Sequence, residues 1–179
     1  MKKQTYKLLV FVILTLGFWM AALQFMHSQN GVSISVLQDL RLATTGDGYY
    51  SPGTLDINFN AKLEGKQGKV GYLIVVPEVE VADLDYGYTR FAFGVGYAFN
   101  DWNIKNVHTS IYATYGFILR GGLSTQSFGL NGDITYKVSD RVGIVALAQF
   151  QERSDLKLMY GKGKIGFSGF IGINFKILR

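Results

Sequence analysis

The stretch Tyr88-Thr-Arg-Phe-Ala-Phe-Gly-Val-Gly-Tyr-Ala-Phe-Asn100 decides the fold, because its side chains alternate in character with a period of two. That period is typical of a β-strand, in which successive side chains point to opposite faces. The bulky face carries Phe91, Phe93, Val95, Tyr97 and Phe99. The other face is Arg90 followed only by glycine and alanine. A face of such small groups indicates a crowded interior, so the bulky face is expected to meet apolar surroundings.

The same alternation recurs from Thr54 to the C-terminus. Most of the resulting strands are long enough to cross a bilayer, which takes about 9–11 tilted residues. The count includes a short strand at Asp155–Tyr160 and a last strand at Ile165–Leu178. The sequence therefore predicts an all-β fold, an antiparallel up-and-down transmembrane β-barrel of about eight strands over residues 54–179.

Three features favour lipid outside the barrel over an apolar core inside it. Two strands pair a bulky face with a small one, charged residues make up only 17% of the chain, and aromatic residues collect at strand ends. The residues predicted to face lipid are Phe91, Phe93, Val95, Tyr97, Phe99, Phe167, Ile171, Ile173 and Phe175. The alternative is a soluble periplasmic β-barrel that binds an apolar ligand.

The N-terminus has the features of a secretory signal peptide. Lys2, Lys3 and Lys7 precede the apolar run Leu8–Met26, and small and polar residues follow. We expect residues 1–28 to be a signal peptide, with a retained anchor as the alternative. Residues 29–53 are predicted to form a plug or an extra strand.

Composition excludes several classes of function. The formal charge of +5, less the three lysines of the leader, leaves +2, which is too weak to indicate a nucleic-acid partner. The chain has no cysteine, and His108 is its only histidine beyond the leader. We therefore expect no metal site and no cofactor.

A set of charged residues on the inward faces is predicted to gather at one barrel end. These residues are Asp56, Glu78, Glu80, Arg90, Arg120 and Lys176. Charges in a narrow lumen must pair to offset the loss of water. The prediction is an ion-pair network that closes the lumen, and the alternative is a gate or a site for a polar ligand.

The pair His108-Thr-Ser110 places an imidazole and a hydroxyl on one strand face. A histidine and a serine are two parts of a nucleophilic hydrolase. The pair also resembles the His-x-Ser of the outer-membrane lipid A deacylases, which implies a lipid A-modifying hydrolase as a second alternative function. The pair faces inward in this alternation, away from lipid. We therefore expect the protein not to be an enzyme.

The strands and turns resemble the small eight-stranded outer-membrane proteins, the family of the OmpA transmembrane domain and OmpX. The phrases Tyr97-Ala-Phe-Asn-Asp-Trp102 and Tyr136-Lys-Val-Ser-Asp-Arg141 look like the turns of that family, and the style of leader and strands looks like envelope proteins of Bacteroidetes-type bacteria. The resemblance implies an outer-membrane monomer that contacts lipid and has a structural or interaction role.

The resemblance also implies that the tightest turns lie on the inner side of the membrane. A count of strands from Thr54 instead puts the Ser139-Asp140 turn on the outer side. Either Val32–Leu42 supplies a further strand, which would remove this conflict, or the outer loops are simply short.

Overall fold

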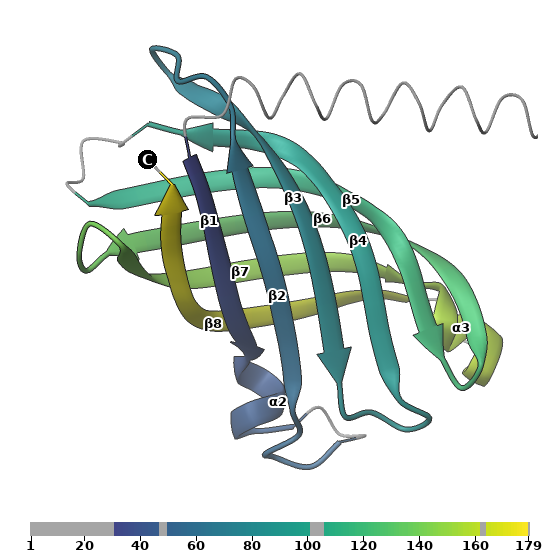
Figure 1. The fold of residues 1–179 in the computed structure, drawn as a ribbon. Coiled ribbons are helices and arrows are strands. Elements are labelled where there is room, and N and C mark those ends of the chain that lie inside the picture. Colours follow the sequence, from purple (N-terminus) through teal and green to yellow (C-terminus); the bar gives the residue numbers. More distant parts are fainter. Residues whose placement is uncertain (1–30, 47–49, 101–105, 162–163, 179) are drawn as a thin grey trace, which may run out of the picture.

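The computed structural model describes residues 31–46, 50–100, 106–161 and 164–178. They form a closed antiparallel barrel of eight strands in chain order, in which β8 also pairs with β1 (Figure 1). The strands are β1 (Gly31–Asp39), β2 (Asp56–Glu64), β3 (Gly71–Ala82), β4 (Tyr88–Phe99), β5 (Val107–Arg120), β6 (Leu123–Lys137), β7 (Val142–Arg153) and β8 (Lys164–Leu178). The helices are α2 (Leu40–Thr44) and α3 (Ser154–Tyr160). The predicted eight-stranded up-and-down barrel is confirmed.

Two boundaries differ from the prediction. The barrel begins at Gly31 rather than at residue 54, because β1 supplies the extra strand within residues 29–53. The strand predicted at Asp155–Tyr160 is wrong, since these residues belong to α3. Asp155 lies in the first turn of that helix, where a negative charge is favourable, and Gly161 ends it with a φ of 67°. The predicted signal peptide lies outside the described residues.

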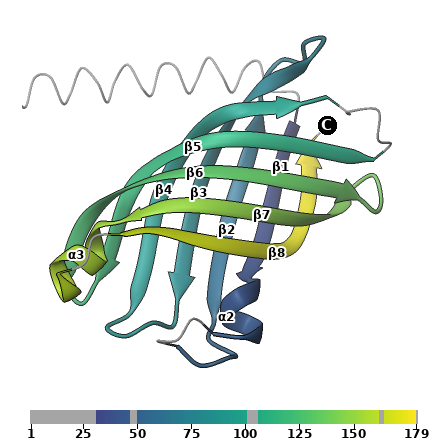
Figure 2. The same cartoon turned by 180° about the vertical axis from the view of Figure 1, so that it is seen from behind.

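The two ends of the barrel are easily distinguished (Figures 1 and 2). The terminal end is where β1 begins and β8 ends, and the helical end is where α2 and α3 lie. The tight turn at Ser139-Asp140 joins β6 to β7 at the terminal end. With β1 included, this turn lies at the same barrel end as the C-terminal end of β8. The extra strand therefore resolves the conflict over the side on which the turn lies. Within the described residues, no helix is long and apolar enough to cross a membrane.

The faces of β4 are oriented as predicted. Phe91 and Val95 are about half exposed, whereas Arg90 is fully buried. Phe93, Tyr97 and Phe99 are half-buried, and the rings of the last two stack edge to face with their centroids 5.3 Å apart. On β8 the predicted residues are all exposed: Phe167, Ile171, Ile173 and Phe175. The large rings therefore point away from the barrel axis, while their contact with lipid stays a prediction.

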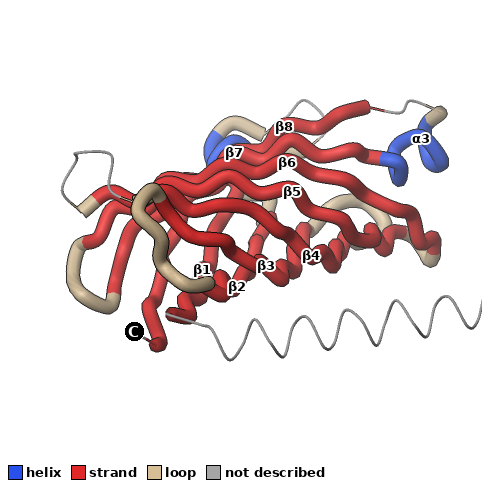
Figure 3. The backbone as a smooth tube through the Cα atoms, turned by 90° about the horizontal axis from the view of Figure 1, so that it is seen from above, coloured by secondary structure: helices blue, strands red, loops and turns tan. Residues whose placement is uncertain are grey.

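The small residues of β4 make room for one large inward ring. A Cβ added to Gly94 would lie 2.9 Å from the ring of Tyr112, and one added to Gly96 would lie 2.1 Å from the backbone oxygen of Ile111. Tyr112 is 1% exposed and belongs to the core inside the barrel. Glycine is thus required here by the close approach of β5. Figure 3 shows α3 at the far ends of β7 and β8, which it connects.

Candidate functional site

An apolar cluster lies between two charged regions of the barrel interior, beside the buried amides of Asn58, Asn131 and Gln149. This cluster, the apolar layer of the interior, is made of Leu37, Ile74, Val76, Ala98, Tyr112, Val145, Leu147 and Phe170. Charged side chains lie on both sides of it, towards the helical end and towards the terminal end. The candidate site is therefore the lumen itself, and its two charged regions are described in turn.

Arg90 is the centre of the helical-end network. Its Nη1 forms an ion pair with Glu78 and lies 3.8 Å from Glu80 Oε2. Its Nη2 donates to Thr114 Oγ1 at 2.8 Å, and its Nε donates to Ser127 Oγ at 3.2 Å. A fully buried guanidinium needs such partners, because an unpaired charge without water is strongly unfavourable. The network therefore connects β3, β4, β5 and β6 across the lumen.

Asp155 connects α3 to the rim of the helical end. It accepts hydrogen bonds from Arg153 Nε and Nη2, both at 2.9 Å, and from Arg120 Nη1 at 3.1 Å. Arg120 also donates to the Tyr50 hydroxyl at 2.7 Å, and the Arg153 guanidinium lies 4.8 Å from the centre of the Tyr88 ring. Burial acts to raise the pKa of Asp155, but the hydrogen bonds and charges of the two arginines outweigh it and hold the pKa below its ordinary value.

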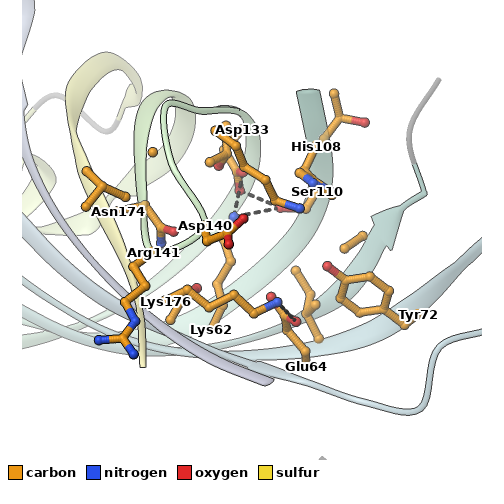
Figure 4. Close-up of a pocket in the computed structure, with 18 of the residues that line it drawn as sticks. Lys62, Glu64, Tyr72, His108, Ser110, Asp133, Asp140, Arg141, Asn174 and Lys176 are labelled. Carbon is orange, nitrogen blue, oxygen red and sulfur yellow. Dashed lines mark hydrogen bonds and ion pairs between the residues drawn. The ribbon is translucent and has the colours of Figure 1, made fainter. Parts of the chain in front are cut away.

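In the terminal-end region the charged side chains of Lys62, Glu64, Asp133 and Lys176 lie around a cavity (Figure 4), and both lysines are partly exposed. Lys62 Nζ donates to Asp133 Oδ1 at 2.5 Å and to Ser110 Oγ at 3.2 Å, and Ser110 donates to Asp133 Oδ2 at 2.5 Å. Next to them Lys176 Nζ donates to Glu64 Oε2 at 3.2 Å. These side chains line a cavity of about 60 Å³. Such a volume admits a few water molecules, whereas sites for drug-sized ligands have about 300–1,000 Å³.

The structure brings together half of the predicted network, namely Glu78, Glu80 and Arg90. Arg120 lies at the same end but pairs with Asp155 instead. Asp56 also lies there and is buried, but its Oδ1 has no hydrogen-bond partner among the described residues.

The predicted position of Lys176 is wrong. It lies at the terminal end and pairs with Glu64, on the far side of the apolar layer from Arg90. The error comes from the strand predicted at Asp155–Tyr160, which reversed the direction assigned to β8.

Sequence reasoning missed five charged residues of the site: Lys62, Glu64, Asp133, Arg153 and Asp155. Lys62 and Asp133 lie on the polar faces of their strands, which is a signal that they point inward. Their pairing was not predictable, because β2 and β6 are not neighbours and the two residues meet only across the lumen.

The solved structures that the chain matches include outer-membrane barrels. The N-terminal β-barrel domain of OprF from Pseudomonas aeruginosa is 10% identical, with a TM-score of 0.52, and the match covers 83% of this chain and 98% of that one. The outer membrane protein Ail of Yersinia pestis, in a nanodisc, is 11% identical, with a TM-score of 0.48, over 82% of this chain and 99% of that one. Neisserial surface protein A is 12% identical, with a TM-score of 0.45, over 83% and 96%. No protein-family profile matches the chain, and no curated protein matches it.

The similarity to OprF supports the barrel fold. The residues exposed on the outer surface are consistent with this fold. Large apolar side chains are exposed on β4, β5, β6, β7 and β8, among them Phe91, Phe117, Phe128, Phe150 and Phe167. An outward apolar surface with polar groups inside is the arrangement of membrane barrels. These findings support the predicted outer-membrane localisation. The chain has the fold of the small eight-stranded outer-membrane β-barrel proteins.

Proposed function

We propose that the protein is a monomeric outer-membrane β-barrel with a structural or interaction role in the cell envelope, whose lumen is closed by its own side chains. The observation that carries this proposal is Arg90, which is fully buried and bound to partners on three other strands. A side chain held in this way obstructs the lumen and also fixes the register of the strands that it connects.

The apolar layer supports closure independently of the charges. Phe170 and Tyr112 enter the lumen from β8 and β5, and both are almost fully buried. Eight-stranded barrels have interiors that side chains can fill, so a water-filled channel is not expected. The alternative of a soluble barrel holding an apolar ligand is not favoured, because the apolar surface faces outward and the cavity of the terminal end is small and polar.

The contacts of Ser110 favour a structural role over a hydrolytic one. Its hydroxyl donates to the Asp133 carboxylate and accepts from the Lys62 ammonium. A catalytic serine instead gives its proton to a neighbouring imidazole. The inward position of Ser110 also separates it from any lipid outside the barrel.

Exposed apolar side chains at the helical end support an interaction role. Tyr86, in the turn between β3 and β4, is 72% exposed, and Leu158 of α3 is 64% exposed. The Cβ of Tyr86 and the methyl group of Met159 both approach the backbone at Gly121, so the turn and α3 meet at the rim. Large exposed apolar groups on a rim are typical of surfaces that contact lipid headgroups or another protein.

The proposal is tested by recovering the full chain from outer membranes and measuring ion conductance after insertion into planar bilayers. We expect detergent-dependent extraction, heat-modifiable migration on gels and no steady conductance. Lys66→Ala, at an exposed turn position, is the control variant and should behave like the wild type. Steady conductance of the wild-type barrel would contradict a closed lumen, and extraction without detergent would contradict insertion.

A further inference from the structure

An apolar groove runs along the outer wall of the barrel between α2 and the strands β6, β7 and β8. Its volume is about 520 Å³, which falls in the range of about 300–1,000 Å³ typical of small-molecule sites. The floor is formed by Gly132, Ala148 and Gly169, and larger side chains such as Ile134 and Phe167 stand beside it. The groove is therefore a depression in a surface that is otherwise covered by bulky apolar groups.

The three floor residues are direct neighbours across three strands. Gly132 pairs with Ala148, and Ala148 pairs with Gly169. A Cβ added to Gly169 would meet no atom within 4 Å, and one added to Gly132 would meet only a backbone oxygen at 3.9 Å. The packing of the barrel therefore does not require small residues here, in contrast to Gly96 inside the lumen.

The wall of the groove on the α2 side contributes its polar groups. β1 ends at Asp39, opposite Phe170 in the middle of β8, and α2 follows directly. Leu40, Arg41 and Thr44 of this helix line the groove, and all three are exposed. A cation on the outer wall of a membrane barrel is tolerated best at the level of the headgroups. Arg41 already interacts within the protein, including electrostatically with Asp56. Its guanidinium has five N–H donors, so it can bind a phosphate as well.

We propose that this groove binds one acyl chain of an anionic lipid, with Arg41 bound to the headgroup phosphate. An acyl chain fits the apolar floor, which is continuous with the outward apolar surface. An anionic headgroup fits the positive charge of Arg41 at the wall. This inference rests on the proposed insertion of the barrel in a membrane. The groove is a specific lipid site, in addition to the non-specific lipid contacts of the outer surface.

The test compares lipids retained by the purified full-length barrel in native mass spectrometry. The barrel is equilibrated with equal amounts of phosphatidylglycerol and phosphatidylcholine in detergent micelles. Ala148→Leu fills the groove, and Ala113→Leu adds the same group to an exposed outward position on β5, away from it. Arg41→Gln removes the proposed headgroup contact, and Lys157→Gln removes one charge from exposed α3 at the same barrel end. Heat-modifiable migration confirms that each variant is folded.

We expect the wild type, Ala113→Leu and Lys157→Gln to retain phosphatidylglycerol in preference to phosphatidylcholine. Ala148→Leu should lose the retained lipid, and Arg41→Gln should lose the preference between the two lipids. Equal retention by Ala148→Leu and Ala113→Leu would overturn the proposal, as would an unchanged preference in Arg41→Gln. A wild-type dimer that Ala148→Leu converts to a monomer would assign the groove to a second copy and overturn it too. A chain that never becomes heat-modifiable would instead contradict the proposed membrane barrel.

Discussion

The two charged regions of the lumen differ in how completely they exclude water. At the helical end Arg90 and Glu78 have fully buried side chains, and the arginine spreads its donors over several strands. At the terminal end the cations are lysines, with side-chain exposures of 12% for Lys62 and 26% for Lys176, beside a small cavity. From this difference we expect loss of a partner in the helical-end network to cost more stability than loss of a partner in the terminal-end pairs.

Loss of Arg90 should have the largest effect. Arg90→Ala leaves Glu78 and Glu80 buried without their cation, and breaking a buried pair in this way costs about 3–5 kcal/mol. Thermal or urea unfolding in detergent measures it, with Lys66→Ala as the exposed control. Equal losses of stability in Arg90→Ala and Lys66→Ala would mean that the buried network contributes no more to stability than an exposed surface charge.

A double variant sharpens the interpretation of Arg90. Arg90→Met with Glu78→Leu removes the closest charge pair and leaves Glu80 beside the polar side chains of Tyr88 and Gln149. Replacing a buried pair by apolar groups is often close to neutral. We therefore expect this variant to recover much of the stability that Arg90→Ala loses. A double variant as unstable as the single one would mean that the hydrogen bonds to Thr114 and Ser127 matter more than the charge pairing.

Loss of Lys62 should have an intermediate effect. Among the described residues, Lys62→Met leaves Ser110 as the remaining partner of the Asp133 carboxylate, at the edge of a cavity that admits a few water molecules. The expected loss is about 1–3 kcal/mol, the range for a buried group that loses a partner. Urea unfolding again measures the loss of stability. A loss as large as that of Arg90→Ala would mean that the two charged regions exclude water equally well.

Lys176→Ala should have the smallest effect at neutral pH. Its pair with Glu64 is partly exposed, and such pairs contribute about 0–1 kcal/mol. A loss well above this range would show that the terminal end is closed more tightly than its cavity indicates. Raising the salt concentration should weaken this pair and leave the Arg90 network unchanged.

Acidification should detach α3 from the barrel rim only at a pH below the ordinary pKa of an aspartate. The folded-state pKa of Asp155 lies below its unfolded value of about 3.9, so its contribution is present above that pH and is lost as pH falls through the folded value. An environment-sensitive fluorophore at Leu158→Cys should show no change from pH 7 to 5 and a transition below about pH 4. Asp155→Asn should abolish that transition, whereas a wild-type transition between pH 7 and 5 would contradict the assignment.

The sequence alone was enough to predict the barrel and the orientation of β4. It also placed Arg90, Glu78 and Glu80 at the same barrel end, without indicating which of the six predicted charges would pair. It was not enough for Asp155–Tyr160, because six residues are too few to separate a strand from a short helix by periodicity. That helix depends on contacts with Arg120, which is 35 residues away along the chain. The same limit applies to Lys62 and Asp133, which are 71 residues apart. Pairs across the lumen depend on the curvature of the closed barrel, which alternation within one strand does not encode.

The central claim is that the large rings point outward into lipid while the interior is closed, and fluorescence quenching tests it most directly. In a background with Trp19→Phe and Trp102→Phe, one variant carries Phe93→Trp on the outer face and another carries Tyr112→Trp inside the lumen. Both are reconstituted in vesicles whose acyl chains carry bromine near the bilayer centre. We predict strong quenching of the Phe93→Trp variant and none of the Tyr112→Trp variant. Quenching of the Tyr112→Trp variant alone would place the lipid-facing surface on the wrong side of every strand and contradict the account.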